Sequence, residues 1–341
     1  MSRYRSATFR ITAIALLAMI AFWGCRKKVE SPAATRDVLG TQVTIVIYDR
    51  GMTQQHLTAT FDGLFDMMAD WEKKVLRPGP DNQIVKIAES AGEKSVPIDD
   101  PLFDMLMEAI RLYDLSGETF DIRYGPMLDA WGFDSRPQVP SPVELDSLKS
   151  YVGQGGMFVA GKSILLAKKG MRFDAREIAI GYAFDMAAEK LAEAGIRTAM
   201  ICCPRVCRTM GDPPNRRGFE MPLANPLNPS EPWGTLRVPV GGIAYASVSA
   251  DRFSAAGKSY HSLLDPRTGF PAERCVGAVV QTPRAATAQA LSYALFVFGT
   301  PDSLAKEGRA TVGGSMLIRE EGGNLISSDA GSLKDGFERA R

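Results

Sequence analysis

The apolar residues of this chain recur at two spacings, one typical of a helix face and one typical of a strand, and the two alternate along most of its length. Apolar residues three or four positions apart predict helices, whereas short β-branched runs bounded by turn residues predict strands. The expected helices cover residues 57–75, 102–113, 177–194 and 286–298. The expected strands cover residues 44–48, 198–203, 275–282 and 315–319, and the strand at 315–319 is expected to be the last of the chain. Residues 217–248 are expected to form further β-structure with turns at 225–226 and 241–242.

The order of these elements predicts the fold class. Helices and strands are interleaved, the sequence shows no internal repeat, and no second long polar stretch divides it. With 45 % apolar and 23 % charged residues, the chain can bury a sizeable core. We therefore expect a single compact α+β body of mixed sheets with packed helices over residues 37–335.

The first 25 residues have the layout of a secretory signal. Three arginines within the first ten residues precede an apolar run over residues 11–23, which is followed by Gly24 and Cys25. The run is shorter than the about 20 residues of a membrane span, and a cysteine after a small residue is where a lipoprotein signal is cut and acylated. Residues 1–25 are expected to be such a signal, with an uncleaved N-terminal anchor as the alternative.

Residues 26–36 follow the predicted signal and show no periodicity. They are rich in Lys, Ser, Pro and Ala, a composition that predicts a tether between an anchor and a folded body. We expect an exported lipoprotein, held at the membrane through a lipidated Cys25, with its body on the periplasmic side.

The charge of the chain is nearly balanced. Forty basic residues stand against thirty-nine acidic ones, which gives a formal net charge of +1. No overall field therefore draws the protein to nucleic acid, and none is expected as a partner. An anionic substrate would have to be held by a local site.

Four cysteines lie in the predicted body, and Cys202, Cys203 and Cys207 fall within six residues. In an oxidising compartment they can pair, and their spacing also suits a soft metal. Adjacent cysteines on a strand point to opposite faces, and no histidine lies nearby in sequence to complete a ligand set. Buried thiols or one disulfide are expected, with Cys275 as the fourth thiol, and a redox or metal centre is the alternative.

Four segments, in order along the chain, resemble the signature segments of the ApbE family. The family patterns are Met-Gly-Thr, TGGAFD with GPL and WGF, DLSxIAKGYAVD, and GKxYSHIIDPRTG. The matching segments are LGTQVTI (39–45), SGETFD with GPMLDAWGF (116–121 and 125–133), DAREIAIGYAFD (174–185) and GKSYHSLLDPRTG (257–269). No one of them is specific enough alone, but four in the family's order make a chance resemblance improbable.

The resemblance implies an activity, a metal and a partner. Members of the family split FAD at its pyrophosphate and move FMN onto a Thr hydroxyl of a target flavoprotein, releasing AMP. Such an attack on phosphorus needs a divalent ion to neutralise charge and a base near the incoming hydroxyl, so Mg²⁺ is implied beside FAD. The implied acceptor is a flavoprotein of an electron-transfer system.

The resemblance also assigns candidate site residues. The positions matched to catalysis are His261, Ser262 and Asp265. Those matched to flavin binding are Thr119, Phe120, Asp121, Asp174 and Ile180, with Arg208 as a candidate partner of a phosphate. Those matched to the metal are the backbone of Ala179 and the side chains of Gln289 and Tyr293.

Several of these positions depart from the family pattern. Gln289 and Tyr293 stand where ADALATA has its Asp and Thr, and an amide is a weaker magnesium ligand than a carboxylate. Ile180 replaces a Lys, and Ser262 replaces a His while His261 lies one position earlier. A one-residue shift along a strand turns a side chain to the opposite face. Residues 204–208 replace a Gly-Gly segment, so backbone freedom is lost there.

Two functions remain open from the sequence. One is an FAD:protein FMN transferase acting at the outer face of a membrane. The alternative is a catalytically degenerate ApbE-like lipoprotein that binds flavin or a partner protein without transfer.

Overall fold

The structure is a computed structural model that describes residues 31–153, 155–213, 218–300 and 312–340. Residues from Pro32 onward form one compact unit, as expected for a single α+β body. The predicted signal, Cys25 and residues 26–30 of the predicted tether lie outside the described residues. No helix among the described residues is long and apolar enough to cross a membrane.

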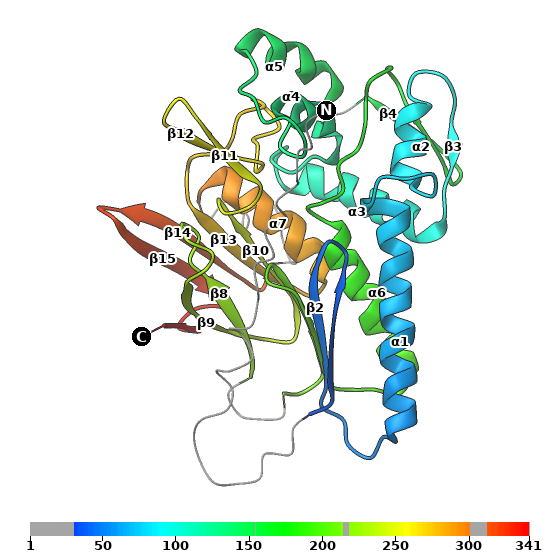
Figure 1. The fold of residues 1–341 in the computed structure, drawn as a ribbon, viewed down its shortest axis with the longest axis vertical. Coiled ribbons are helices and arrows are strands. Elements are labelled where there is room, and N and C mark those ends of the chain that lie inside the picture. The colour runs from blue at the N-terminus through cyan, green and yellow to red at the C-terminus, as the bar shows by residue number, and fades with distance from the viewer. Residues whose placement is uncertain (1–30, 154, 214–217, 301–311, 341) are drawn as a thin grey trace, which may run out of the picture. The chain divides into compact units, whose positions relative to one another are not determined.

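An eight-stranded antiparallel sheet is the centre of the fold (Figure 1). Its strand order is β1-β2-β6-β7-β10-β13-β14-β15, so neighbours come from distant parts of the chain. The strands are β1 (Ala33–Val38), β2 (Thr41–Ile47), β6 (Ala199–Cys202), β7 (Val206–Met210), β10 (Gly241–Ser247), β13 (Gly277–Thr282), β14 (Gly314–Glu321) and β15 (Asn324–Gly331).

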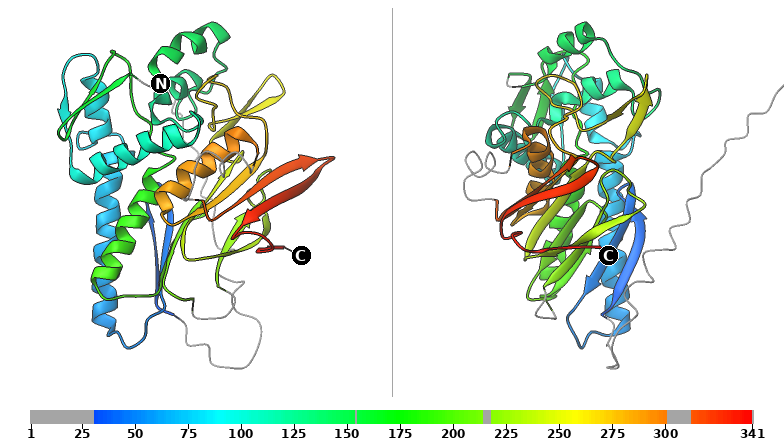
Figure 2. Two further views of the ribbon diagram at one scale, coloured as in Figure 1. Left: turned by 180° about the vertical axis from the view of Figure 1, so that it is seen from behind. Right: turned by 90° about the vertical axis from the view of Figure 1, so that its left-hand side faces the viewer.

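Three long helices cover one face of this sheet, as the two views of Figure 2 also show. They are α1 (Gln54–Trp71), α6 (Ala179–Glu193) and α7 (Ala285–Phe298). A small sheet of order β16-β9-β8 packs on the other face and closes a second apolar core. Its strands are β8 (Phe219–Ala224), β9 (Pro232–Val238) and β16 (Phe337–Arg339). Side-chain alternation along β10 sends Ala244 toward the helices and Tyr245 toward this sheet.

The remaining elements gather beyond one end of the central sheet (Figure 1). The helices there are α2 (Gln83–Glu89), α3 (Asp100–Leu115), α4 (Gly125–Trp131) and α5 (Pro142–Leu148). The strands are β3 (Val96–Pro97), β4 (Met157–Ala160) and β5 (Ser163–Leu166), which form a small sheet, and the hairpin β11 (Arg252–Ala255) with β12 (Lys258–His261). Short helical turns cover Glu72–Leu76, Ile122–Tyr124 and Lys149–Tyr151.

The four long predicted helices are confirmed as α1 with its following turn, α3, α6 and α7. The strands predicted at 44–48, 198–203, 275–282 and 315–319 are confirmed as β2, β6, β13 and β14.

Three expectations were wrong. Strand β14 is not the last, because β15 and β16 follow it. Strand β15 pairs along one edge only and is mostly exposed, so its sequence lacks an apolar alternation.

The second wrong expectation concerns the turn at residues 241–242. Gly241 and Gly242 begin strand β10 instead of turning the chain. A Cβ at Gly242 would lie 2.3 Å from the backbone of Ala285, so the glycine lets helix α7 begin directly on the sheet.

The third concerns the predicted tether, whose last four residues belong to β1. This strand pairs with β2 from Ala33 opposite Val46 to Val38 opposite Thr41. It is an exposed edge strand of polar sequence, which is why the pattern of apolar residues did not show it.

Candidate functional site

The candidate site lies where the beginning of α6 meets α7, and three of the segments singled out in the sequence come together there. The Gln289 side chain contacts residues 176–181, and the Tyr293 side chain contacts Leu264 and lies against Phe120. Helices α6 and α7 can approach this closely because residue 181 is glycine. A Cβ at Gly181 would lie 2.3 Å from the carbonyl oxygen of Ala285.

Gln289 is buried, and both ends of its amide are hydrogen-bonded to the backbone. Its Oε1 accepts a hydrogen bond from the Gly181 N–H at 2.7 Å, and its Nε2 donates to the carbonyl oxygen of Arg176 at 2.8 Å. The side chain therefore bridges α7 to the start of α6. Its amide oxygen, the atom that a metal would need, already accepts a hydrogen bond.

Tyr293 is one turn further along α7 and is also buried. Its hydroxyl donates to the carbonyl oxygen of Leu264, and its ring packs against Phe120 and Tyr124 at centroid distances of 6.1 and 5.8 Å. Burial raises the pKa of Tyr293 well above its usual range, so the phenol keeps its proton. It serves as a hydrogen-bond donor inside an aromatic core.

The third candidate metal position is the carbonyl oxygen of Ala179. This oxygen accepts a hydrogen bond from the indole Nε1 of Trp71 at 2.9 Å. The Trp71 ring stacks on Tyr182 at a centroid distance of 5.3 Å, so helix α1 fixes the donor in place. All three candidate metal positions are thus tied to other protein groups.

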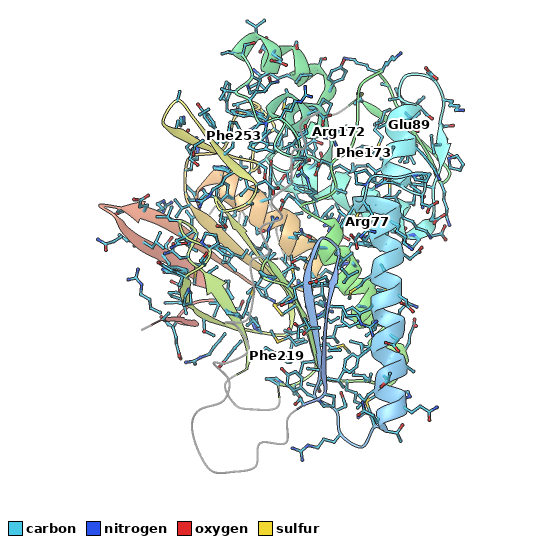
Figure 3. The ribbon with its side chains drawn as sticks, in the orientation of Figure 1. Arg77, Glu89, Arg172, Phe173, Phe219 and Phe253 are labelled. Carbon is cyan, nitrogen blue, oxygen red and sulfur yellow. A yellow bond between two sulfur atoms is a disulfide. The ribbon has the colours of Figure 1, made fainter. Side chains whose placement is uncertain are left out.

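Asp174 is a buried carboxylate at the approach to α6, and Arg176 covers it. The Arg176 Nε lies 3.2 and 3.0 Å from the two oxygens of Asp174, and its Nη1 lies 3.2 Å from Asp134 and 3.4 Å from Asp251. Arg172, labelled in Figure 3, approaches Asp174 to 3.8 Å and pairs with Asp129. One guanidinium thereby contacts three carboxylates from different segments.

Ser262 and His261 point to different surroundings, as alternation along a strand requires. The Ser262 hydroxyl lies 3.4 Å from the Asp251 carboxylate. His261 is buried edge-on against Phe296 at a centroid distance of 5.5 Å. Burial lowers the pKa of His261 to about 4, and its Nδ1 has no hydrogen-bond partner among the described residues. His261 is therefore neutral at pH 7. It does not face the Asp251 carboxylate, which lies near Ser262.

The other matched positions are held by local bonds. Asp121 accepts from the Arg123 side chain at 2.7 Å and from the Gly153 N–H at 2.8 Å, and Asp265 is paired with Arg267 at 2.7 Å within a turn. Phe120 is part of the apolar core, and the Thr119 hydroxyl donates to the carbonyl oxygen of Ser116 at 2.6 Å. Ile180 is half-buried on α6 and packs against the core.

Arg208 is paired with a buried carboxylate inside the protein. Its Nε lies 3.0 Å from Asp185 on α6, and the same carboxylate accepts from the N–H groups of Ala285 and Ala286 at 2.9 and 3.0 Å. Asp185 thus caps the first turn of α7 from a neighbouring helix. A phosphate would have to compete with Asp185 for Arg208.

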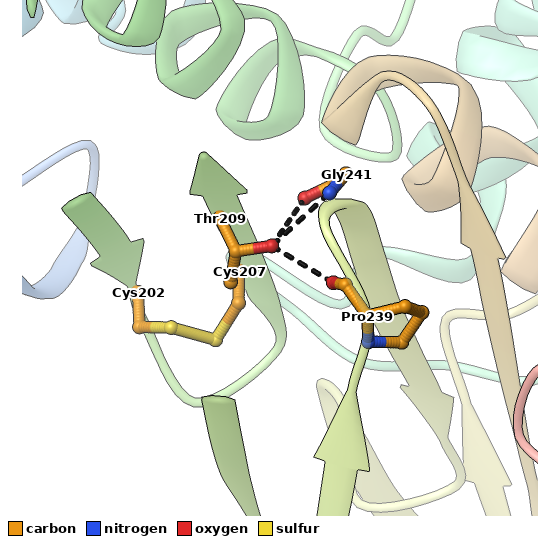
Figure 4. Close-up of a disulfide and its surroundings, with 5 residues drawn as sticks. All are labelled: Cys202, Cys207, Thr209, Pro239 and Gly241. Carbon is orange, nitrogen blue, oxygen red and sulfur yellow. Dashed lines mark hydrogen bonds between the residues drawn. A yellow bond between two sulfur atoms is a disulfide. The ribbon is translucent and has the colours of Figure 1, made fainter. Parts of the chain in front are cut away.

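The hairpin between β6 and β7 is closed by a disulfide between Cys202 and Cys207 (Figure 4). This confirms the expected single disulfide, and Cys203 and Cys275 are buried free thiols, as was also expected. The bonded pair faces the core of the small sheet, whereas Cys203 faces the helices. A redox or metal centre built on Cys202, Cys203 and Cys207 would need all three sulfur atoms on the same side of the sheet.

Side-chain bonds at two places, its tip and strand β7, hold this hairpin. At its tip, Arg205 pairs with Glu177 at 2.6 Å, next to the start of α6. Further along β7, the Thr209 hydroxyl donates to the carbonyl oxygen of Pro239 at 2.9 Å and accepts from the Gly241 N–H at 3.1 Å (Figure 4). The segment that replaces the family's glycines is therefore rigidly held.

A surface hollow of about 240 Å³ lies between two of the signature segments. Its walls are Tyr113, Glu118, Lys149, Val152, Gly153, Pro266 and Arg267. It does not reach Gln289 or Tyr293, so the region where α6 meets α7 is not part of it.

The family model described as the ApbE family matches residues 39–310, which is most of the chain. The chain belongs to the ApbE family. It is similar to the FAD:protein FMN transferase of Haemophilus influenzae, with 23 % identity over 95 % of this chain and 96 % of that protein. It is also similar to the FAD:protein FMN transferase of Treponema pallidum, with 25 % identity over 86 % of this chain and 85 % of that protein.

Solved ApbE structures share the fold. The ApbE protein of Thermotoga maritima superposes with a TM-score of 0.77 at 22 % identity, covering 87 % of this chain and 97 % of that chain. The flavinyl transferase ApbE of Pseudomonas stutzeri gives a TM-score of 0.77 at 19 % identity, covering 90 % and 96 %. The family and the α+β fold inferred from the signature segments are confirmed.

The residues at the ApbE metal position do not fit magnesium in this chain. Magnesium demands several oxygen ligands at near-octahedral geometry, and carboxylates are its usual protein ligands. Here one candidate oxygen accepts from Gly181, one accepts from Trp71, and the third belongs to a protonated phenol. The described residues also contain no group of three or more His, Cys, Asp or Glu side chains arranged to hold a metal.

Sequence reasoning missed the side chain that dominates this site, Arg176. The signal was present, because Arg176 stands where the DLSxIAKGY pattern has its Ser. Its partners Asp134 and Asp251 lie outside every signature segment, so only the fold brings them together.

Proposed function

We propose that this chain is an exported, membrane-anchored ApbE-family protein that no longer transfers FMN and instead binds a partner flavoprotein of an electron-transfer system. The observation that carries the proposal is the state of the metal position. Both ends of the Gln289 amide are hydrogen-bonded to backbone at and just before the start of α6. The Tyr293 hydroxyl donates to the carbonyl oxygen of Leu264.

Loss of transfer follows from the chemistry of the replaced side chains. Attack on a pyrophosphate needs a divalent ion or equivalent positive charge and a base beside the incoming hydroxyl. Ser262 is a poor base, and the buried imidazole of His261 lies against Phe296. Ile180 supplies no charge. None of the required elements is supplied at these positions.

The size of the surface hollow favours a protein over a dinucleotide as the bound molecule. Pockets that enclose small ligands measure about 300–1,000 Å³. The hollow beside Glu118 and Arg267 measures about 240 Å³, which is below this range. A protein partner can bind the outer surface without opening the α6–α7 contact.

An active FAD:protein FMN transferase is the second candidate. It is favoured by the curated relatives of that name, which match up to 95 % of the chain. It is also favoured by the buried carboxylates of Asp121, Asp174 and Asp185, which stay at their motif positions.

An assay for AMP release separates the two candidates. The chain is incubated with FAD, Mg²⁺ and a Thr-containing acceptor, with the Haemophilus influenzae relative as the positive control. We expect no AMP above background, and FMN found on the acceptor would restore the transferase reading.

A double variant, Gln289→Asp with Tyr293→Thr, tests the physical cause. It replaces the two side chains by a carboxylate and a short hydroxyl, so we expect Mg²⁺ to raise its melting temperature. At ten times the dissociation constant the gain is about 1.4 kcal/mol. The wild-type chain is the matched control and should not respond; an equal response of both chains would show that the substitutions do not decide metal binding.

A further inference from the structure

Arg176 joins four separate parts of the fold through one residue. Its guanidinium contacts Asp174 just before α6, Asp134 after α4, and Asp251 at the base of the β11–β12 hairpin. Its carbonyl oxygen accepts from Gln289 on α7 at 2.8 Å. The side chain is 29 % exposed, so most of it is removed from bulk water.

Asp251 holds the two ends of the hairpin segment together. Its carbonyl oxygen accepts from the Ser262 N–H at 3.1 Å, and its carboxylate lies 3.4 Å from the Ser262 hydroxyl. Its φ of 28° lies in a region that non-glycine residues rarely adopt. Such a conformation persists only where surrounding contacts enforce it, and the Arg176 ion pair is one of these contacts.

We propose that Arg176 is a clamp that holds the β11–β12 hairpin shut over Ser262. The same oxygen of Asp251 faces both the Arg176 guanidinium and the Ser262 hydroxyl. A molecule that approaches Ser262 past the hairpin base must therefore separate an ion pair first. In a chain with Ser at position 176, as in the family pattern, no such pair can form.

The outer part of the hairpin is held by different contacts, which allows the clamp to be tested separately. Phe253, labelled in Figure 3, stacks on Tyr260 at 5.5 Å, and both rings lie near Trp131 at 6.3 and 5.1 Å. These aromatic contacts do not involve Arg176, so a variant without the clamp still has them. Removing the clamp should therefore increase opening of the hairpin without unfolding the body.

Limited trypsin digestion of the full chain measures this opening. Arg252 and Lys258 are exposed residues of the hairpin, and trypsin can cut after either of them once the strands separate. Cleavage at these two positions is followed by mass spectrometry. In Arg176→Ser we expect it to be about fivefold faster than in the wild type, a factor that corresponds to the upper end of the free energy of a partly exposed ion pair. The rate ratio should shrink at about 0.5 M salt, because salt screens the pair.

Two further variants keep the test decisive. Arg172→Ser removes a neighbouring arginine whose main partner is Asp129, and it should leave hairpin cleavage unchanged. Asp251→Asn removes the carboxylate charge that pairs with Arg176, and asparagine tolerates the same backbone conformation. It should therefore reproduce the effect of Arg176→Ser.

The double variant Arg176→Ser with Asp251→Asn should cleave no faster than either single variant, because both break the same contact. Unchanged cleavage in Arg176→Ser, equal acceleration in Arg172→Ser, or additive effects in the double variant would overturn the clamp. This result does not depend on whether the chain transfers FMN.

Discussion

Replacing Asp185 with alanine is expected to lower the free energy of unfolding by about 3 kcal/mol, the cost of removing one partner from a buried ionic network. Asp185 is 4 % exposed and accepts from the first two N–H groups of α7, whose N-cap residue Arg284 supplies no side-chain cap. Its removal leaves these two amides and the Nε of Arg208 without the acceptor that they share. Urea unfolding followed by circular dichroism measures the loss.

The control for this variant is an ion pair at the surface. Asp62 pairs with Arg36 with about half of each side chain exposed, so Asp62→Ala should cost less than about 1 kcal/mol. Equal losses in the two variants would mean that Asp185 does not organise the start of α7.

Acidification is expected to destabilise the protein through His261. Burial lowers its pKa from 6.5 to about 4. Between these two pH values the imidazole binds a proton in the unfolded chain but not in the folded chain. The stabilising contribution is present above pH 6.5 and is lost as the pH falls toward 4. The fall of the pKa from 6.5 to about 4 corresponds to about 3 kcal/mol of stability across this window.

The variant His261→Gln isolates this contribution, because its side chain does not titrate. Urea unfolding at several pH values between 7 and 4 should show a steeper loss for the wild type than for the variant. The second histidine, His56, is exposed on α1 and remains in both proteins. Parallel pH profiles would show that His261 is not a buried neutral imidazole.

Elements with strong periodicity or with a long apolar run could be predicted from sequence. The helix expected at 286–298 is found at Ala285–Phe298, because nearly every one of its residues is apolar and buried. Strand β15 could not be predicted, since an exposed edge strand imposes no apolar alternation. The turn expected at residues 241–242 was misplaced because these glycines serve the close approach of α7, a contact between distant segments.

The candidate site was only partly predictable. Comparison with the family's ADALATA pattern identified Gln289 and Tyr293 as departures from the metal site, but it did not show what their side chains contact. The Gly181 N–H and the Leu264 carbonyl oxygen become their partners only when α6 and the segment after β12 pack on α7. The signal, the lipid anchor and the part of the tether before residue 31 remain predictions.

Calorimetric titration of Mg²⁺ into the wild-type chain, alone and with FAD present, tests the central claim most directly. The claim is that Gln289, Tyr293 and Ala179, all bonded within the protein and none of them a carboxylate, do not form a magnesium site. We predict no saturable heat of binding in either titration. A one-to-one magnesium isotherm that Gln289→Ala abolishes would contradict the account.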